Sequence, residues 1–284
     1  MRDHLAWGDR HLGAGRTQEA LAEYQLALRQ RGDDPDVLLR LAHGYALLDR
    51  LDETGQYYAR LLSLDSLAVD QAVADFLAMA KRALSEDDRA RFARALEQVE
   101  AMRPGGVPDE LALPFARYYY ELDEYARALP LYIAVVAAEP DSVAAEVRYE
   151  LGRVYYELGE CVQALSNFEV FLESRPSGEQ RDDAKWHAGH CAYRLAEENL
   201  LAGRPSEALA GFERVIELGS PQALLDDAWF ERGEVLFGVG EFGEALRSYE
   251  RVLDLNPSRT GRKVRLAEER IRTIRYRGAG AEEG

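Results

Sequence analysis

Residues 151–176 read LGRVYYELGECVQALSNFEVFLESRP, and this stretch decides the fold. Gly152 lies near the middle of one amphipathic segment, and Ala164 and Phe168 lie four residues apart in the next, where they share a helix face. A small residue lets two helices approach closely, and the neighbouring ring fills the space beside it. A glycine between the segments reverses the chain, and Pro176 stops the second one. The stretch therefore predicts a pair of antiparallel helices.

The same pattern recurs with a period of about 34 residues. Every unit has a ring in its second segment, and all but the third have a small residue in the first. The small residues are Gly8, Ala42, Ala116, Gly152, Gly189 and Gly233, and the rings are Tyr24, Tyr58, Phe92, Tyr132, Phe168, Phe212 and Tyr249. Neither helix of a pair can bury its apolar stripe alone, so consecutive pairs must stack.

This pattern resembles the tetratricopeptide repeat, whose signature is W-x2-L-G-x2-Y, then A-x3-F, then P. The last unit follows it with Trp229, Gly233, Ala245, Tyr249 and Pro257. The resemblance spans roughly residues 3 to 258. It implies an all-α fold, a right-handed superhelical solenoid of about seven helical hairpins plus a C-terminal capping helix. The C-terminal half is also similar to repeats of bacterial envelope lipoproteins.

Breaks in the pattern predict the domain organisation. The proline- and glycine-rich run at 104–108 predicts a hinge. It separates units one to three, residues 1–103, from units four to seven, residues 109–258. Residues 259–277 are basic and predict a capping helix, and 278–284 predict a disordered tail.

Two units depart from the common pattern. In the third, Phe76 occupies the small-residue place, which predicts irregular packing. In the sixth, alignment of Gly189 with Ala208 and Phe212 requires seven extra residues, or close to two helical turns. We therefore expect a lengthened first helix there.

Composition argues against several classes of function. With 51 acidic and 35 basic residues the net charge is -16, which disfavours nucleic-acid binding. Cys161 and Cys191 are too few for a cysteine-built zinc site, and although they could approach across neighbouring pairs, we expect free thiols. His187, His190 and Cys191 are a weak metal set. No phosphate-binding loop, nucleophile elbow or dinucleotide fingerprint occurs, so we expect neither cofactor nor metal and no enzyme.

No stretch approaches the roughly 20 apolar residues of a membrane-spanning helix, and the N-terminus lacks the apolar core of a signal peptide. We therefore expect a cytoplasmic protein as the sequence is written. Removal of a leader would leave a periplasmic or lipid-anchored location open.

The first helices of the units are expected to line a concave, partner-binding face. Residues at three related places along these helices predict an aromatic ladder with a basic stripe beside it. They are Arg117, Tyr120, Tyr149, Arg153, Tyr156, Trp186, His190, Tyr193, Phe230 and Phe237. Such a face suits a protein or peptide with hydrophobic anchors and an acidic group.

Other interpretations stay open. The rings could instead fill contacts between neighbouring helices. The chain could be a structural subunit of a larger envelope, pilus or secretion assembly without a peptide groove, or an accessory domain of an enzyme. The carboxylate clamp of peptide-binding family members is not matched, because Leu5 and Asp9 stand at the equivalent places of the first unit. The acidic row Glu110, Glu146, Asp183 and Asp227 complements helix dipoles and is interpreted as stabilising.

Overall fold

A computed structural model describes residues 3–138 and 143–281 of the chain. Across these residues the secondary structure is helical, with no strand, which confirms the all-α prediction. The chain forms two compact units, Met1–Leu122 and Asp123–Gly284, and each is described by itself. The run at 104–108 connects two helices inside the first unit, and a hinge there stays a prediction.

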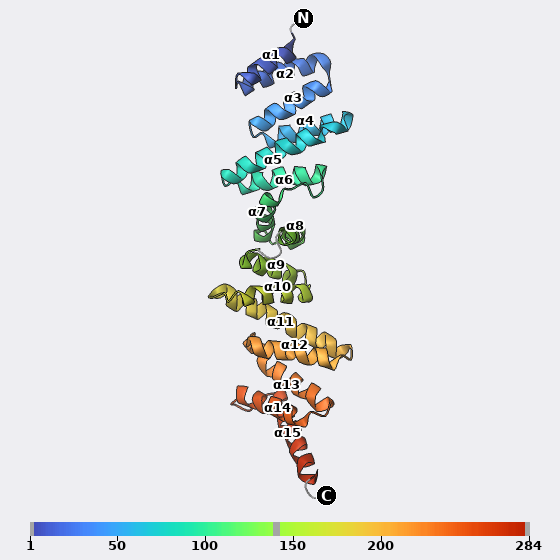
Figure 1. The fold of residues 1–284 in the computed structure, drawn as a ribbon, viewed down its shortest axis with the longest axis vertical. Coiled ribbons are helices and arrows are strands. Elements are labelled where there is room, and N and C mark those ends of the chain that lie inside the picture. The colour runs from blue at the N-terminus through green and yellow to red at the C-terminus, as the bar shows by residue number, and fades with distance from the viewer. Residues whose placement is uncertain (1–2, 139–142, 282–284) are drawn as a thin grey trace. The chain divides into compact units, whose positions relative to one another are not determined.

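The first unit is a series of antiparallel helix pairs (Figure 1). Each pair follows directly on the one before, as the repeat predicts. The helices are α1 (His4–Gly13), α2 (Thr17–Arg31), α3 (Pro35–Leu47), α4 (Leu51–Leu64), α5 (Val69–Ser85), α6 (Arg89–Met102) and α7 (Asp109–Glu121), with a 3-10 turn, η1 (Ser66–Ala68), before α5.

The second unit continues the same arrangement. Its first helix packs against the next, and three hairpins and a last long helix follow. The helices are α8 (Tyr125–Ala138), α9 (Ala145–Glu157), α10 (Cys161–Glu173), α11 (Glu179–Leu201), α12 (Pro205–Leu218), α13 (Gln222–Gly238), α14 (Phe242–Leu255) and α15 (Arg262–Ala281).

The predicted contact between a small residue and a ring holds the hairpins together. A Cβ atom added to Gly152 would lie 2.9 Å from the ring of Phe168, and one added to Gly233 would lie 2.7 Å from the ring of Tyr249. Both rings are fully buried. The glycines therefore set how closely the two helices of a hairpin approach.

Helix α11 has 23 residues, so the lengthened helix is confirmed, but the predicted register within it is wrong. Gly189 does not face the ring of Phe212; it packs against the backbone of Ser220 in the connection after α12. Ala196, two turns later, takes its place against α12 and belongs to the same core cluster as Phe212. The inserted turns lie before the hairpin contact, and they shift it by seven residues.

The third hairpin contacts the second at Phe76, the residue that departs from the repeat pattern. Phe76 is fully buried, and its ring centre lies 6.0 Å from that of Tyr58 in α4. The adjacent Asp75 accepts a hydrogen bond of 2.5 Å from the Tyr58 hydroxyl and lies 3.0 Å from Nδ1 of His43 in α3. A large ring and a buried carboxylate thus replace the small residue, and they link α3, α4 and α5.

A similar polar link joins first helices elsewhere. Tyr24 donates a hydrogen bond of 2.8 Å to Asp9, and Asp9 also accepts one of 2.8 Å from Arg40 in the next hairpin. Tyr249, Glu234 and Arg270 form the equivalent set in the second unit. The tyrosine whose ring packs on the small residue therefore also donates a hydrogen bond to the carboxylate of the next residue in the chain.

The cysteines form a disulfide, so the prediction of free thiols is wrong. Cys161 is the first residue of α10, and Cys191 lies in the middle of α11. Their Cα atoms are 5.0 Å apart, within the range that a disulfide requires. Both lie in the buried cluster around Phe168. The bond covalently joins consecutive hairpins, a proximity that spacing in the sequence cannot establish.

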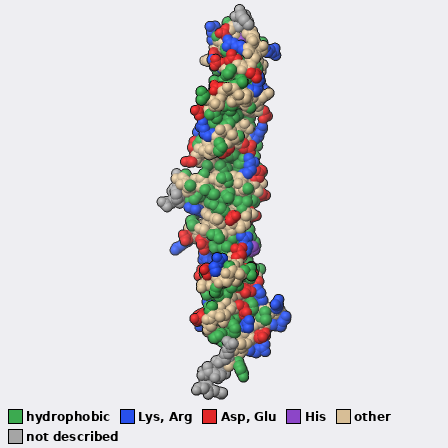
Figure 2. All heavy atoms as spheres, turned by 90° about the vertical axis from the view of Figure 1, so that its right-hand side faces the viewer, with side chains coloured by type: hydrophobic (Ala, Val, Ile, Leu, Met, Phe, Trp, Pro, Cys, Tyr) green, Lys and Arg blue, Asp and Glu red, His purple; other side chains and the backbone are tan. Residues whose placement is uncertain are grey.

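Helix α15 covers the last hairpin. Val264, Ala267 and Ile271 are buried in one core cluster with residues of α13 and α14. Near the C-terminal end, Figure 2 shows Lys and Arg side chains gathered on the surface. Three of the basic residues pair with acidic side chains of the hairpin: Lys263 with Asp227, Arg270 with Glu234, and Arg275 with Glu250.

Helix α15 extends to Ala281, so it includes the first four residues of the segment 278–284 for which the sequence predicts disorder. Residues 282–284 lie outside the described part of the chain.

Candidate functional site

Two first helices of the second unit, α9 and α11, carry most of the predicted partner-binding residues. On α9, Tyr149, Arg153 and Tyr156 recur at intervals of four and three residues. On α11, Trp186, His190 and Tyr193 do the same. This spacing places each set along one helix face.

Three rings from these helices form a half-exposed cluster, which we call the aromatic patch: Tyr156, Trp186 and His190. The rings of Trp186 and His190 are stacked, with centres 5.4 Å apart and planes 7° from parallel. The Tyr156 ring is edge-on to both, and its hydroxyl lies 3.3 Å from Nδ1 of His190. Trp186 remains 43% exposed, so the patch offers a large apolar ring held in place by its neighbours.

His187 supports the patch from below. It is buried, and its ring centre lies 4.4 Å from that of Tyr156 and 4.9 Å from that of Trp186. Its Nδ1 lies 2.9 Å from the backbone carbonyl oxygen of Asp183. Burial lowers the pKa of His187, so its neutral form is favoured.

Arg153, the predicted reader of an acidic group, already has acidic partners. Its guanidinium donates a hydrogen bond of 3.3 Å to the Asp183 carboxylate and lies 3.5 Å from Glu157. The same Asp183 oxygen accepts a hydrogen bond of 2.7 Å from the Tyr149 hydroxyl. Burial, and next this bond, raise the pKa of Tyr149 to about 12. An acidic ligand would therefore compete with Asp183 for Arg153.

The remaining predicted residues do not join this cluster. Tyr149 and Phe230 are buried and pack on rings within their own hairpins. Tyr193 packs edge-on against Phe212, 5.5 Å away between ring centres. Phe237 is half-buried beneath Arg270 of α15, whose guanidinium carbon lies 4.9 Å from the ring centre. For these rings the structure shows packing between helices.

Arg117 and Tyr120 lie on α7, in the first unit, and both are half-buried. Since each unit is described by itself, they are not placed against the aromatic patch.

Asp183 and His187 are the residues whose part in this site the sequence did not reveal. Asp183 belongs to the acidic row attributed to helix dipoles, and other members of the row also pair across first helices. Glu110 lies 3.1 Å from Lys81 of α5, and Asp227 pairs with Lys263. The sequence carries one signal for these ion pairs: a basic residue on the neighbouring first helix, placed where it can reach the acidic one.

The described residues contain neither a metal cluster nor a membrane-spanning helix. Within 3–138 and 143–281, no group of three or more His, Cys, Asp or Glu side chains is arranged to hold a metal ion. Cys191, one of the three weak metal candidates, is in the disulfide. In the same part of the chain, every helix is too short or too polar to cross a bilayer.

Comparison with family models decides the family. A model described as tetratricopeptide repeat matches residues 5–69 and 113–179, and a second so described matches 226–259, together more than half of the chain. The chain belongs to the tetratricopeptide repeat family. No curated protein matches the sequence significantly. The similarity to envelope lipoproteins is not confirmed.

Solved tetratricopeptide repeat structures are similar at low identity. The C-terminal part of a repeat protein from Cytophaga hutchinsonii is 18% identical, with a TM-score of 0.37 over 93% of this chain and 98% of that one. A repeat protein from Parabacteroides merdae is 13% identical, with a TM-score of 0.33 over 96% and 97%. YrrB, described as having an unusual peptide-binding site, is 18% identical, with a TM-score of 0.32 over 87% and 97%.

Proposed function

We propose that this tetratricopeptide repeat protein is a non-catalytic adaptor that holds a partner protein or peptide against the aromatic patch. The fold supports a general role in protein–protein interaction. The observation that carries the more specific proposal is Trp186, a large ring that is 43% exposed although His190 and Tyr156 fix its orientation. Rigid aromatic side chains of this kind are enriched among residues that dominate binding energy.

The surroundings of the patch indicate the chemistry of the partner. An apolar side chain of the partner would pack on Trp186 and displace water from its ring. An acidic group next to that anchor would reach Arg153, but it must share the guanidinium with Asp183, 3.3 Å away. We therefore propose that the hydrophobic anchor provides most of the affinity, and that the acidic group sets the orientation of the partner. Arg117 and Tyr120, on α7 of the first unit, stay predicted partner-binding residues by themselves.

Substitution of Trp186 tests the proposal, and the chain offers a matched control. Trp7 in the first unit is 44% exposed, almost the same as Trp186. Proteins that co-purify with the wild type from the native host would be compared with those retained by Trp186→Ala and by Trp7→Ala. We expect the partner to be retained by Trp7→Ala and lost by Trp186→Ala. With the purified partner, removal of a hot-spot ring should raise Kd about 30-fold.

Retention of every partner by Trp186→Ala would reject the adaptor proposal. It would favour the alternative of a structural subunit that is embedded through other surfaces. A catalytic protein among the partners lost specifically with Trp186→Ala would instead make the chain an accessory subunit of that enzyme. Arg153→Ala is a poorer test, because it also leaves Asp183 without its cation.

A further inference from the structure

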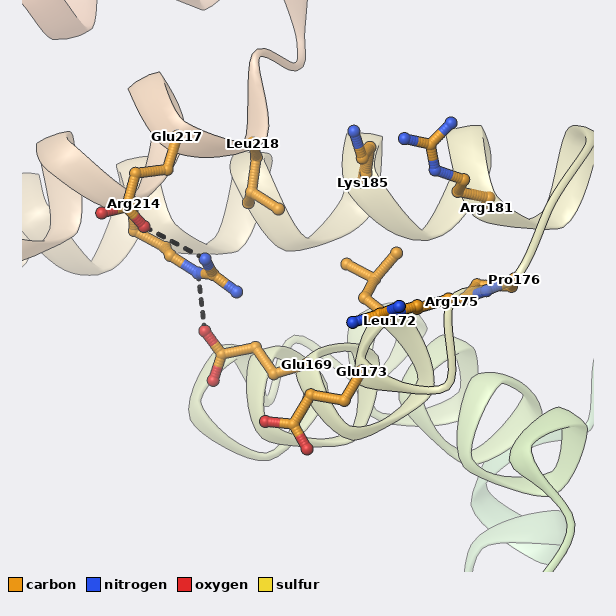
Figure 3. Close-up of a pocket in the computed structure, with 10 residues that line it drawn as sticks. All are labelled: Glu169, Leu172, Glu173, Arg175, Pro176, Arg181, Lys185, Arg214, Glu217 and Leu218. Atoms are coloured by element: carbon orange, nitrogen blue, oxygen red, sulfur yellow. Dashed lines mark hydrogen bonds and ion pairs between the residues drawn. The ribbon is translucent and has the colours of Figure 1, made fainter.

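A separate cleft lies where α10, the connection after it, the start of α11 and the end of α12 meet (Figure 3). Its volume is about 620 Å³, within the range of pockets that bind small ligands or short peptide segments. It shares no residue with the aromatic patch. The lining residues are Glu169, Leu172, Glu173, Arg175, Pro176, Arg181, Lys185, Arg214, Glu217 and Leu218.

The two ends of the cleft differ in whether their basic side chains pair with carboxylates. At one end Arg214 donates hydrogen bonds of 2.7 Å to Glu169 and 3.2 Å to Glu217, drawn as dashed lines in Figure 3. Toward the other end lie Arg181 and Lys185. No ion pair or side-chain hydrogen bond to either of them, or to Arg175, occurs within the described residues.

Arg175, Arg181 and Lys185 line one cleft of a chain whose net charge is -16. Most arginines in the second unit contact a carboxylate, as Arg214, Arg232 and Arg270 do. Lys185 is half-buried, whereas Arg175 and Arg181 are exposed. Separate carboxylates of a bound chain would supply counter-charges to these cations.

The rest of the lining selects among anions. Glu169, Glu173 and Glu217 line the same cleft, and their charge repels a polyanion that would fill it. Leu172, Pro176 and Leu218 add an apolar surface on which a chain can lie. A peptide segment combines separated carboxylates and apolar atoms with backbone N–H groups, which can donate hydrogen bonds to the glutamates.

We propose that this cleft binds a short acidic peptide segment of a partner protein, with its side-chain carboxylates between Arg175, Arg181 and Lys185. The guanidinium groups bind carboxylates through paired N–H donors, and the lysine adds a point charge. This site is independent of the aromatic patch, so it stands or fails separately from the adaptor function proposed above.

Fluorescence anisotropy with two labelled heptapeptides tests the proposal on the full chain. One probe is Gly-Ser-Glu-Glu-Glu-Ser-Gly, and the other has glutamine at the three glutamate positions. We expect the glutamate probe to bind at least about tenfold more tightly, because charge-assisted hydrogen bonds are lost with glutamine. The double variant Arg181→Gln/Lys185→Gln should lose about tenfold or more of the affinity for the glutamate probe.

The matched control is Arg262→Gln/Arg265→Gln, which removes two exposed cations from α15 in the same unit. It should bind the probe within about twofold of the wild type, and circular dichroism checks that both variants fold. Equal or absent binding of the two probes, or equal losses in both variants, would overturn the proposal. If inorganic pyrophosphate displaces the probe at a lower concentration than unlabelled peptide does, the ligand of the cleft is a small anion and the peptide proposal is wrong.

Discussion

Two histidines show how individual residues in this repeat protein acquire opposite acid–base properties. The Asp75 carboxylate, 3.0 Å from Nδ1 of His43, stabilises the charged imidazolium and raises the pKa of His43 above the ordinary 6.5. His187 is buried beneath the aromatic patch, and burial lowers its pKa below 6.5. Its neighbours Asp183 and Glu157 oppose this shift, but desolvation is the largest cause.

NMR titration of the imidazole signals should therefore separate these residues, with His43 titrating above pH 6.5 and His187 below it. The contribution of His43 to stability is present below pH 6.5 and is lost as the pH rises through its folded-state pKa. The contribution of His187 has the opposite sign, because protonation below pH 6.5 favours the unfolded chain. A His43 pKa at or below that of His187 would contradict the geometry. Asp75→Asn should bring the pKa of His43 down toward 6.5.

At the scale of the helix, the close packing of α13 on α14 requires a residue without a side chain at position 233. A methyl group at Gly233 would lie 2.7 Å from the Tyr249 ring, which is fully buried and cannot move aside easily. Gly243, near the start of α14, has no atom within 4 Å of the place where a methyl group would stand. The same substitution at these two sites therefore has opposite consequences.

We expect Gly233→Ala to lower the free energy of unfolding by about 1–3 kcal/mol through overpacking. Gly243→Ala should be neutral or raise it by up to about 1 kcal/mol, because alanine is the better helix former. Urea unfolding followed by circular dichroism measures both. Similar effects of the two substitutions would show that the close approach of α13 and α14 does not limit their packing.

Within each unit, a hairpin is stabilised by contacts with its neighbours in the chain. The disulfide adds a covalent bond between two such neighbours. Cys161 and Cys191 join α10 to α11 and close a loop over a sequence separation of 30. The Met1–Leu122 unit contains no cysteine. Because contacts in a stack are between neighbours, a local change should remain local.

Replacement of both cysteines by alanine should destabilise the second unit by about 3–4 kcal/mol, by the loop-closure estimate. Hydrogen exchange measured by mass spectrometry should show faster exchange in α9 to α12 and unchanged exchange in α1 to α6. Equal acceleration in both units would contradict local coupling. Alkylation of the purified, denatured protein should leave both cysteines unmodified until a reductant is added, because neither is a free thiol.

The sequence predicts local features of this protein well. The lengthened α11 follows from seven extra residues, and the contact of Gly233 with Tyr249 follows from their place in the motif. The candidate site was less predictable. Helical spacing predicts that Trp186 and His190 share a face, but it does not show that Phe237 is covered by Arg270 of α15.

By itself, the sequence determined that the chain is helical and built of repeated helix pairs, because these properties depend on residues close together in the chain. Only the tertiary structure decided that Cys161 bonds to Cys191, that Arg153 is held by Asp183 and that Ala196 replaces Gly189. These contacts join different helices. They depend on how each helix is rotated and shifted against its neighbour, which packing of the side chains sets.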